Sequence, residues 1–214
     1  MYLNALSRSA EGLSKADKID VLEERKHNMY FDGLYAHDLM LVKLDRDVDK
    51  DPLPFIRMNL DGMSSPQPDD ELSVLGYGDI DKNANSIVIP DQLQHVAVGA
   101  VDFTYCWTLY EAGAVALREQ GMVAQDLTQD QMCAEAKGAG TCAGDSGGPL
   151  FVPKGNNNDE DILVGAVAWH RGGCGNDLFP DVYSNVTWFA DWIITNACEM
   201  SGDASHLPCP SEND

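Results

Sequence analysis

The sequence predicts an all-β fold of the barrel or sandwich class that ends in a single helix. Three observations support this prediction. Short apolar runs of strand length recur along the chain, few long segments show a helical period, and 19 glycines and 10 prolines among 214 residues indicate many turns. A chain of this length can bury a sizeable core, as one large domain or two small ones.

Six apolar runs of strand length follow a weakly patterned, polar stretch at residues 1–37. The runs are residues 38–45, 72–78, 86–90, 93–101, 161–170 and 180–186. Residues 63–71 are rich in serine, proline and aspartate, and they are the best candidate for a linker. The pattern of many short strands therefore extends over most of the chain.

The predicted helix lies near the end of the sequence. Residues 187–199 carry Trp188, Trp192 and Ile193 at helical spacing. Thr187 is the expected N-cap, because a threonine hydroxyl can accept a hydrogen bond from an N–H of the first turn.

The charge of the chain excludes some classes of partner. A net charge of −21, from 35 acidic and 14 basic residues, argues against binding to nucleic acid or to an anionic membrane. The acids cluster in three segments, at residues 44–52, 68–71 and 156–161. None has the regular alternation of a calcium-binding loop, so we interpret them as solvated loop tips and predict no metal and no cofactor. No apolar run reaches the length of about 18 residues that predicts a membrane span.

The six cysteines predict disulfides. Their number is even and no Cys-x-x-Cys pair occurs, which disfavours a zinc site and favours a disulfide framework in an oxidising compartment. The spacing alone does not fix which cysteines pair. The first residues contain no apolar core of signal-peptide length, which fits poorly with such a compartment.

Residues 144–149, Gly-Asp-Ser-Gly-Gly-Pro, are the main candidate for a functional motif. A serine hydroxyl becomes nucleophilic when a base removes its proton, and attack on a carbonyl builds an oxyanion that N–H groups must stabilise. Glycines let the backbone curl so that the N–H groups of Gly144, Asp145 and Ser146 point one way. The alternative interpretation is an ordinary glycine-rich turn.

The stretch Cys-Ala-Gly-Asp-Ser-Gly-Gly-Pro-Leu, residues 142–150, resembles the nucleophile loop of the chymotrypsin-like serine proteases, the trypsin-type peptidase family S1. Further segments resemble other parts of that family in the same order. They are residues 37–44, 72–78, 93–106, 131–142, 164–175 and 179–193, and the resemblance covers about residues 20–198.

The resemblance implies two six-stranded antiparallel β-barrels of the chymotrypsin-like type, the first incomplete, and a C-terminal helix. The implied boundaries are an incomplete barrel, a linker, the second barrel with its helix, and a tail, at residues 1–62, 63–71, 72–198 and 199–214. It further implies hydrolysis of peptide bonds in proteins, protein inhibitors as further partners, a monomer, and secretion.

The same resemblance assigns roles to residues. Ser146 corresponds to the nucleophile and Asp38 to the triad aspartate, while the N–H groups of Gly144 and Ser146 correspond to the oxyanion hole. Asp145 corresponds to the partner of a new amino terminus formed on activation. The implied disulfides are Cys106–Cys133, Cys142–Cys174 and Cys198–Cys209, each worth roughly 2–4 kcal/mol.

The implied substrate pocket departs from the trypsin-like pattern. Gly140, followed by Thr141, stands where trypsin-like members have an aspartate at the pocket base. Asp181 stands on the neighbouring wall, where it would favour a basic substrate side chain, unless it lies in a surface loop. His170 follows Trp169 in place of a glycine, and it either narrows the pocket entrance or lies outward at the rim.

The triad histidine has no counterpart in the sequence. His27 is expected in a surface turn, and His37 is expected on a strand where it could not face both Asp38 and Ser146. We expect a chain that starts just after the histidine, a fragment, and therefore no peptidase activity from the chain as written. The alternative is an inactive serine-protease homologue that acts as a binding or regulatory protein.

Overall fold

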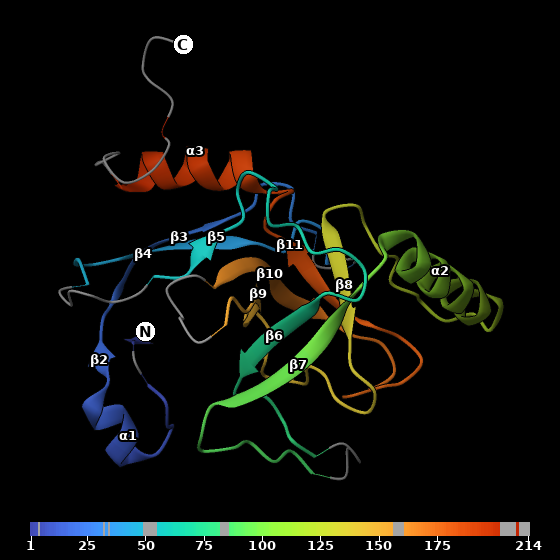
Figure 1. Cartoon of the computed structure of the whole chain (residues 1–214), viewed down its shortest axis with the longest axis horizontal. Coiled ribbons are helices and arrows are strands. Elements are labelled where there is room, and N and C mark those ends of the chain that lie inside the picture. Colours follow the sequence, from blue (N-terminus) through green and yellow to red (C-terminus); the bar gives the residue numbers. More distant parts are fainter. Residues whose placement is uncertain are drawn as a thin grey trace.

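Six antiparallel strands close into a barrel in the second half of the chain, as the computed structural model shows (Figure 1). The structure describes residues 1–3, 5–31, 33, 35–48, 55–81, 86–155, 161–201 and 209. The barrel strands are β6 (Glu71–Gly76), β7 (Gln94–Val101), β8 (Gln131–Glu135), β9 (Pro149–Val152), β10 (Ile162–Trp169) and β11 (Asp181–Asn185). The sheet order β11-β8-β7-β6-β9-β10 closes because β10 also pairs with β11. The predicted all-β fold is confirmed.

The barrel interior forms because alternate residues of each strand point inward. On β6 the inward side chains are Leu72 and Val74, which are almost fully buried. They pack with a cluster contributed by all the barrel strands, including Val98, Ala134, Leu150, Val164 and Tyr183.

The first half of the chain contributes short ribbons. β1 (Tyr2–Leu3) pairs with β2 (Asp17–Lys18), and β3 (Val21–Lys26) pairs with β4 (Met40–Leu44). The short helix α1 (Ala10–Lys15) connects β1 to β2, and β5 (Arg57–Met58) adds to β10 in parallel. Within the described residues, this half forms no second closed barrel.

The predicted C-terminal helix is confirmed as α3 (Ala190–Ser201). It covers β4, and Phe189 and Ile193 pack there with Leu39 and Leu41 (Figure 1). Thr187 is not its N-cap, so that prediction was wrong.

The Thr187 hydroxyl is used elsewhere, which explains this difference. It donates to the carbonyl of Asn59 (2.8 Å) and accepts from the Asn59 side chain (2.9 Å). Asn185 Oδ1 instead accepts the N–H groups of Thr187 and Trp188 in the turn before α3.

The helix α2 (Phe103–Glu119) and the segment after β6 differ from the sequence prediction. α2 was not predicted; its N-cap is Asp102, whose side chain accepts the Tyr105 N–H (2.8 Å). Residues 86–90 are not the predicted strand. Ile87 is 77% exposed. The segment is joined to the end of the loop after β6 by a hydrogen bond from the Ile80 N–H to the Val88 carbonyl. An apolar run of strand length is therefore not sufficient to identify a strand here.

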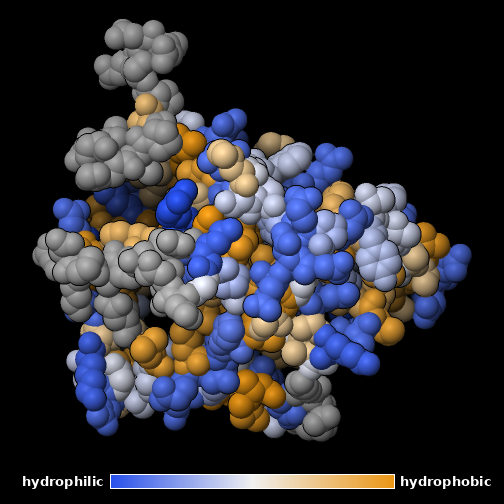
Figure 2. All heavy atoms as spheres, in the orientation of Figure 1, coloured by the Kyte–Doolittle hydropathy of each residue, from blue (hydrophilic) through white to orange (hydrophobic). Residues whose placement is uncertain are grey.

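The three disulfides pair as the resemblance implied. Cys106–Cys133 ties α2 to β8, Cys142–Cys174 ties two loops at one end of the barrel, and Cys198–Cys209 ties the end of α3 to residue 209. None of the helices in the described residues is both long and apolar enough to cross a membrane. On the face seen in Figure 2, polar and apolar residues are interspersed.

Candidate active site

The loop between β8 and β9 carries Ser146 at an exposed tip. Gly144 (φ 99°) and Gly147 (φ 78°) adopt left-handed backbone conformations that glycine accepts without strain. The loop is anchored to β10, because the Gly147 N–H donates to the Val167 carbonyl (2.8 Å) and the Val167 N–H donates to the Gly148 carbonyl (2.9 Å). The glycines therefore shape a turn that presents one serine.

The main-chain N–H groups of Gly144 and of Ser146 itself form no hydrogen bond with any described residue. The Asp145 N–H between them donates to the Cys142 carbonyl (3.0 Å). Free, fixed N–H groups next to a nucleophile are what an oxyanion requires.

Asp145 bonds to main-chain donors at the base of the loop. Its carboxylate accepts the N–H groups of Gly78 (2.7 Å) and Cys142 (2.8 Å). A Cβ at Gly76 would lie 1.9 Å from Asp145 Oδ1, so that glycine makes room for the carboxylate. Among the described residues Asp145 has no ion pair, and the amino group of Met1 donates to the Ile19 carbonyl instead. A cavity of about 80 Å³ adjoins the carboxylate.

Asp38 precedes β4 and is held there through its main chain. The Ser184 hydroxyl of β11 donates to the Asp38 carbonyl (2.6 Å). The preceding residue, His37, lies in a turn with φ 54° rather than on the expected strand, and its N–H donates to Asp130 Oδ2 (2.7 Å). The barrel thus fixes the backbone at the predicted triad aspartate.

His27 and His37 form a stacked pair near α3. Their ring centroids lie 5.0 Å apart at 18°, and His27 also contacts Phe189 (5.3 Å) and Trp192 (4.9 Å). His27 is therefore half-buried rather than in an open surface turn, and the Met29 N–H donates to its Nδ1 (3.2 Å). Burial lowers the pKa of His27, and the neighbouring His37 lowers it further.

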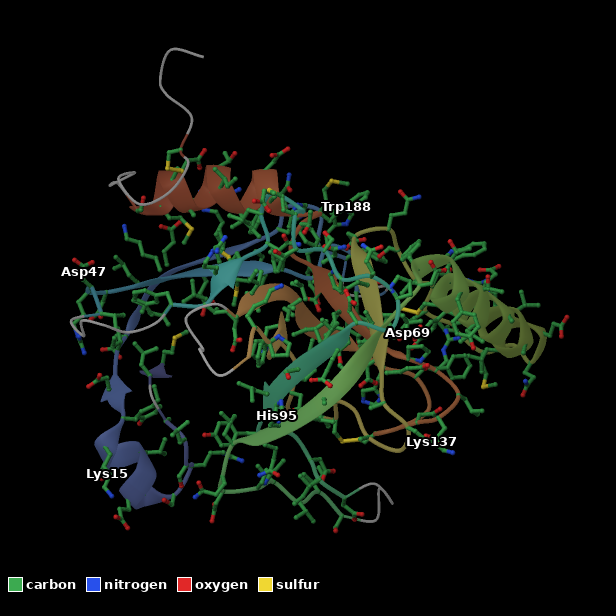
Figure 3. All side chains as sticks on the ribbon, in the orientation of Figure 1. Lys15, Asp47, Asp69, His95, Lys137 and Trp188 are labelled. Atoms are coloured by element: carbon green, nitrogen blue, oxygen red, sulfur yellow. A yellow bond between two sulfur atoms is a disulfide. The ribbon has the colours of Figure 1, made fainter. Side chains whose placement is uncertain are left out.

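No histidine of the described residues forms a hydrogen bond with Ser146. His95, on β7 (Figure 3), bonds through Nε2 to Ser73 Oγ (3.0 Å). His206 lies outside the described residues. His170 is the described histidine that shares a cavity with Ser146.

That cavity, of about 240 Å³, brings together four of the predicted site residues: Cys142, Ser146, Trp169 and His170. It is also lined by Tyr35 and Gln125, which the sequence analysis missed. No sequence signal marks either residue, because each reaches the cavity from a loop far from Ser146 in the chain.

Asp181 lies behind the pocket wall, in the interior. It is 6% exposed, and its Oδ2 accepts the Thr141 N–H (2.6 Å). A Cβ at Gly140 would lie 2.5 Å from the same oxygen. The carboxylate therefore fills the space beside Gly140, and the surface-loop interpretation was wrong. Burial raises the pKa of Asp181, while contacts from Thr141 and the charge of His170 oppose the rise.

The wall above Asp181 is packed from behind by α2. The Trp169 ring meets the Tyr110 ring edge-on (4.9 Å, 73°), and the Tyr110 hydroxyl donates to the Pro180 carbonyl (2.6 Å). Arg171 donates to the carbonyls of Tyr110 (3.1 Å) and Gln125 (2.5 Å). These contacts fix the strand end that carries the cavity-lining side chains.

Comparisons with known proteins agree with this geometry. Residues 4–193 match the family model described as trypsin. Trypsin delta of Drosophila erecta is 34% identical over 135 residues, which are 63% of this chain and 45% of that protein. Trypsin eta of Drosophila melanogaster is 32% identical over 172 residues, 78% of this chain and 56% of that protein. The chain thus spans about half the length of the curated relatives it matches.

A solved structure shares the fold. Neuropsin, a serine protease expressed in the limbic system of mouse brain, superposes with a TM-score of 0.71. The sequences are 23% identical, and the match covers 94% of this chain and 78% of neuropsin. At this identity the likeness speaks for the fold alone.

Proposed function

The chain belongs to the trypsin family, and from this premise we propose that it serves as a serine endopeptidase with Ser146 as its nucleophile. One observation carries the proposal: an exposed serine lines a cavity, and its own N–H and that of Gly144 have no hydrogen-bond partner among the described residues. Protein and peptide chains are the proposed substrates. The three disulfides support an extracellular compartment.

In the proposed reaction, Ser146 Oγ attacks the carbonyl carbon of the scissile peptide bond while its proton passes to an imidazole base. The N–H groups of Gly144 and Ser146 stabilise the oxyanion. The imidazolium then protonates the leaving amine, and water releases the acyl group by the same steps in reverse order. Asp38 is proposed to orient the imidazole, a role supported by the fixed backbone at this residue.

Among the described residues no hydrogen bond joins a histidine to Ser146, although His170 lines the same cavity. His27 and His37 are stacked on each other near α3, and His95 is bonded to Ser73. A serine without a base is a weak nucleophile, so we expect slow turnover from this chain alone. The same observation favours the second candidate function, an inactive homologue that binds other proteins.

Added imidazole distinguishes the two functions. Hydrolysis of a fluorescent casein substrate is measured while free imidazole is raised into the millimolar range. We expect turnover that rises with imidazole in the wild-type chain and is absent in Ser146→Ala. Ser73→Ala is the matched control, because Ser73 lies on β6 outside the site, and it should behave as wild type.

A wild-type chain that hydrolyses nothing at any imidazole concentration would contradict the peptidase proposal and support the binding protein. Turnover that persists in Ser146→Ala would show that another group, or a contaminant, is responsible.

A further inference from the structure

We propose that Ser73 and His95 form a second reactive site, on the outer face of the barrel, at which Ser73 is acylated by small neutral esters. Ser73 lies on β6 and His95, labelled in Figure 3, lies on β7. The Ser73 hydroxyl oxygen is 3.0 Å from His95 Nε2, which is the hydrogen-bond distance that a nucleophile and its base require. The proposal goes beyond the proposed peptidase function and does not depend on Ser146.

The pairing of β6 and β7 brings the two side chains together. Leu75 of β6 stands directly opposite His95 of β7. Ser73 is two residues before Leu75 and shares its face, which is turned away from the interior residues Leu72 and Val74. A long side chain can reach a diagonal neighbour of this kind on the next strand. The pair is therefore built on two hydrogen-bonded strands, which position side chains more precisely than loops do.

Ser73 and His95 line one cavity, of about 660 Å³, which is large enough for a small molecule. His95 is exposed, whereas Ser73 is 4% exposed. A small molecule in the cavity can therefore meet the serine hydroxyl, but a bulky protein chain cannot. For the same reason Ser73→Ala remains a neutral control for the hydrolysis of casein.

The cavity wall sets the class of ester. The wall is mainly apolar, with side chains from Ile56, Leu75, Pro149, Phe151 and Pro153. Its ionised side chains are the acids Glu71 and Asp161, and no lysine or arginine of the described residues lines it. An apolar acyl chain gains from burial there, while a negatively charged one is repelled.

The proposed step is a single acyl transfer. The Ser73 hydroxyl donates to Nε2 of neutral His95, and its oxygen attacks the carbonyl carbon of the ester. A bond forms between Ser73 Oγ and the acyl carbon, and the bond from that carbon to the alcohol oxygen breaks. The hydroxyl proton passes to His95 Nε2 and from there to the leaving alcohol. The products are an acyl ester of Ser73 and a free alcohol.

The experiment treats the wild-type chain and Ser146→Ala with p-nitrophenyl hexanoate near neutral pH. We expect p-nitrophenol to be released in both, and tandem mass spectrometry of the digested protein should place the hexanoyl group on Ser73. The p-nitrophenyl half-ester of adipic acid has a chain of similar length that ends in a carboxylate. It should acylate Ser73 roughly tenfold more slowly, because Glu71 and Asp161 repel it.

One variant and a control test the base. His95→Gln should lower the rate of Ser73 acylation by about a hundredfold or more, which is the usual contribution of a general base. His27→Gln also removes an imidazole, but His27 is stacked on His37 near α3 and does not line the cavity. The acylation rate of Ser73 in His27→Gln should equal that of wild type.

Hexanoyl groups found only on residues other than Ser73 would overturn the proposal, and this result needs no variant. Equal rates of Ser73 acylation in wild type and His95→Gln would overturn it as well. Circular dichroism checks the fold of each variant, and His95→Asn replaces His95→Gln if the latter does not fold. Casein hydrolysis at Ser146 is a separate measurement, so either proposal can fail while the other stands.

Discussion

The carboxylate of Asp181 occupies the space that a side chain at residue 140 would need. A Cβ built at Gly140 would lie 2.5 Å from Asp181 Oδ2, closer than non-bonded atoms tolerate. An acid at residue 181 and a side chain at residue 140 therefore exclude each other. This relationship explains why the buried acid of β11 occurs together with a glycine at residue 140.

Gly140→Ala should consequently destabilise the protein. The added methyl group must displace a buried carboxylate, and overpacking of this kind costs about 1–3 kcal/mol. For a protein of this size the melting temperature should fall by roughly 2–10 °C. Thermal unfolding followed by circular dichroism measures it.

The same substitution in an Asp181→Ala background should cost much less, since the colliding carboxylate is absent. Equal costs in the two backgrounds would show that residues 140 and 181 do not share the space.

Asp181→Asn should stabilise the free protein near neutral pH. Burial raises the pKa of the Asp181 carboxyl, so folding favours its protonated form. The corresponding stability is present below the ordinary aspartate pKa of about 3.9 and is lost as pH rises through the raised value. Thermal unfolding across this pH range should show a smaller decline in the variant than in wild type.

Asp91→Asn is the matched control, because Asp91 is exposed and its described bond is made by its main-chain carbonyl. It should follow the wild-type curve. If Asp181→Asn also follows that curve, folding does not raise the pKa of the Asp181 carboxyl.

The sequence predicted the parts of this site that lie close together in the chain. The loop at 142–150 and the C-terminal helix follow from local composition and spacing, and the disulfide pairing followed from the family resemblance. The helix α2 was missed although Cys106, Tyr110 and Ala114, its buried residues, recur every four positions. That period follows directly after the apolar run of residues 93–101, whose alternation favours a strand.

Other features could not be predicted, because they depend on packing between distant segments. Tyr35 and Gln125 meet Ser146 at one cavity, although each lies in a loop without a motif. The position of Thr187 depends on Asn59, a residue more than a hundred positions earlier. Hydrogen bonds of this kind override a local capping signal.

The His27–His37 stack should make stability depend on pH. Burial and the neighbouring imidazole lower the pKa of His27, whereas Asp130 opposes this. The stability that results is present above the ordinary histidine pKa of about 6.5 and is lost as pH falls towards the lowered value. In NMR titrations His27 should therefore titrate below about pH 6.5.

His37→Asn removes the neighbouring charge and should raise the pKa of His27. Asparagine is a suitable replacement because it tolerates the left-handed conformation seen at residue 37 (φ 54°). His95→Gln should leave the His27 titration unchanged. A His27 pKa that does not respond to His37→Asn would mean that the charge of His37 does not contribute to it.

Tyr110→Phe tests the support behind the pocket wall. The Tyr110 hydroxyl is buried and donates to the Pro180 carbonyl (2.6 Å), and its removal leaves that carbonyl without this donor. Such a loss costs about 1–3 kcal/mol. The ring that meets Trp169 is retained, so imidazole-dependent casein hydrolysis should not change. Tyr105→Phe, on the same helix but 56% exposed, should cost much less in thermal unfolding. Slower imidazole-dependent hydrolysis in Tyr110→Phe would show that the hydroxyl, and not the ring alone, positions the wall.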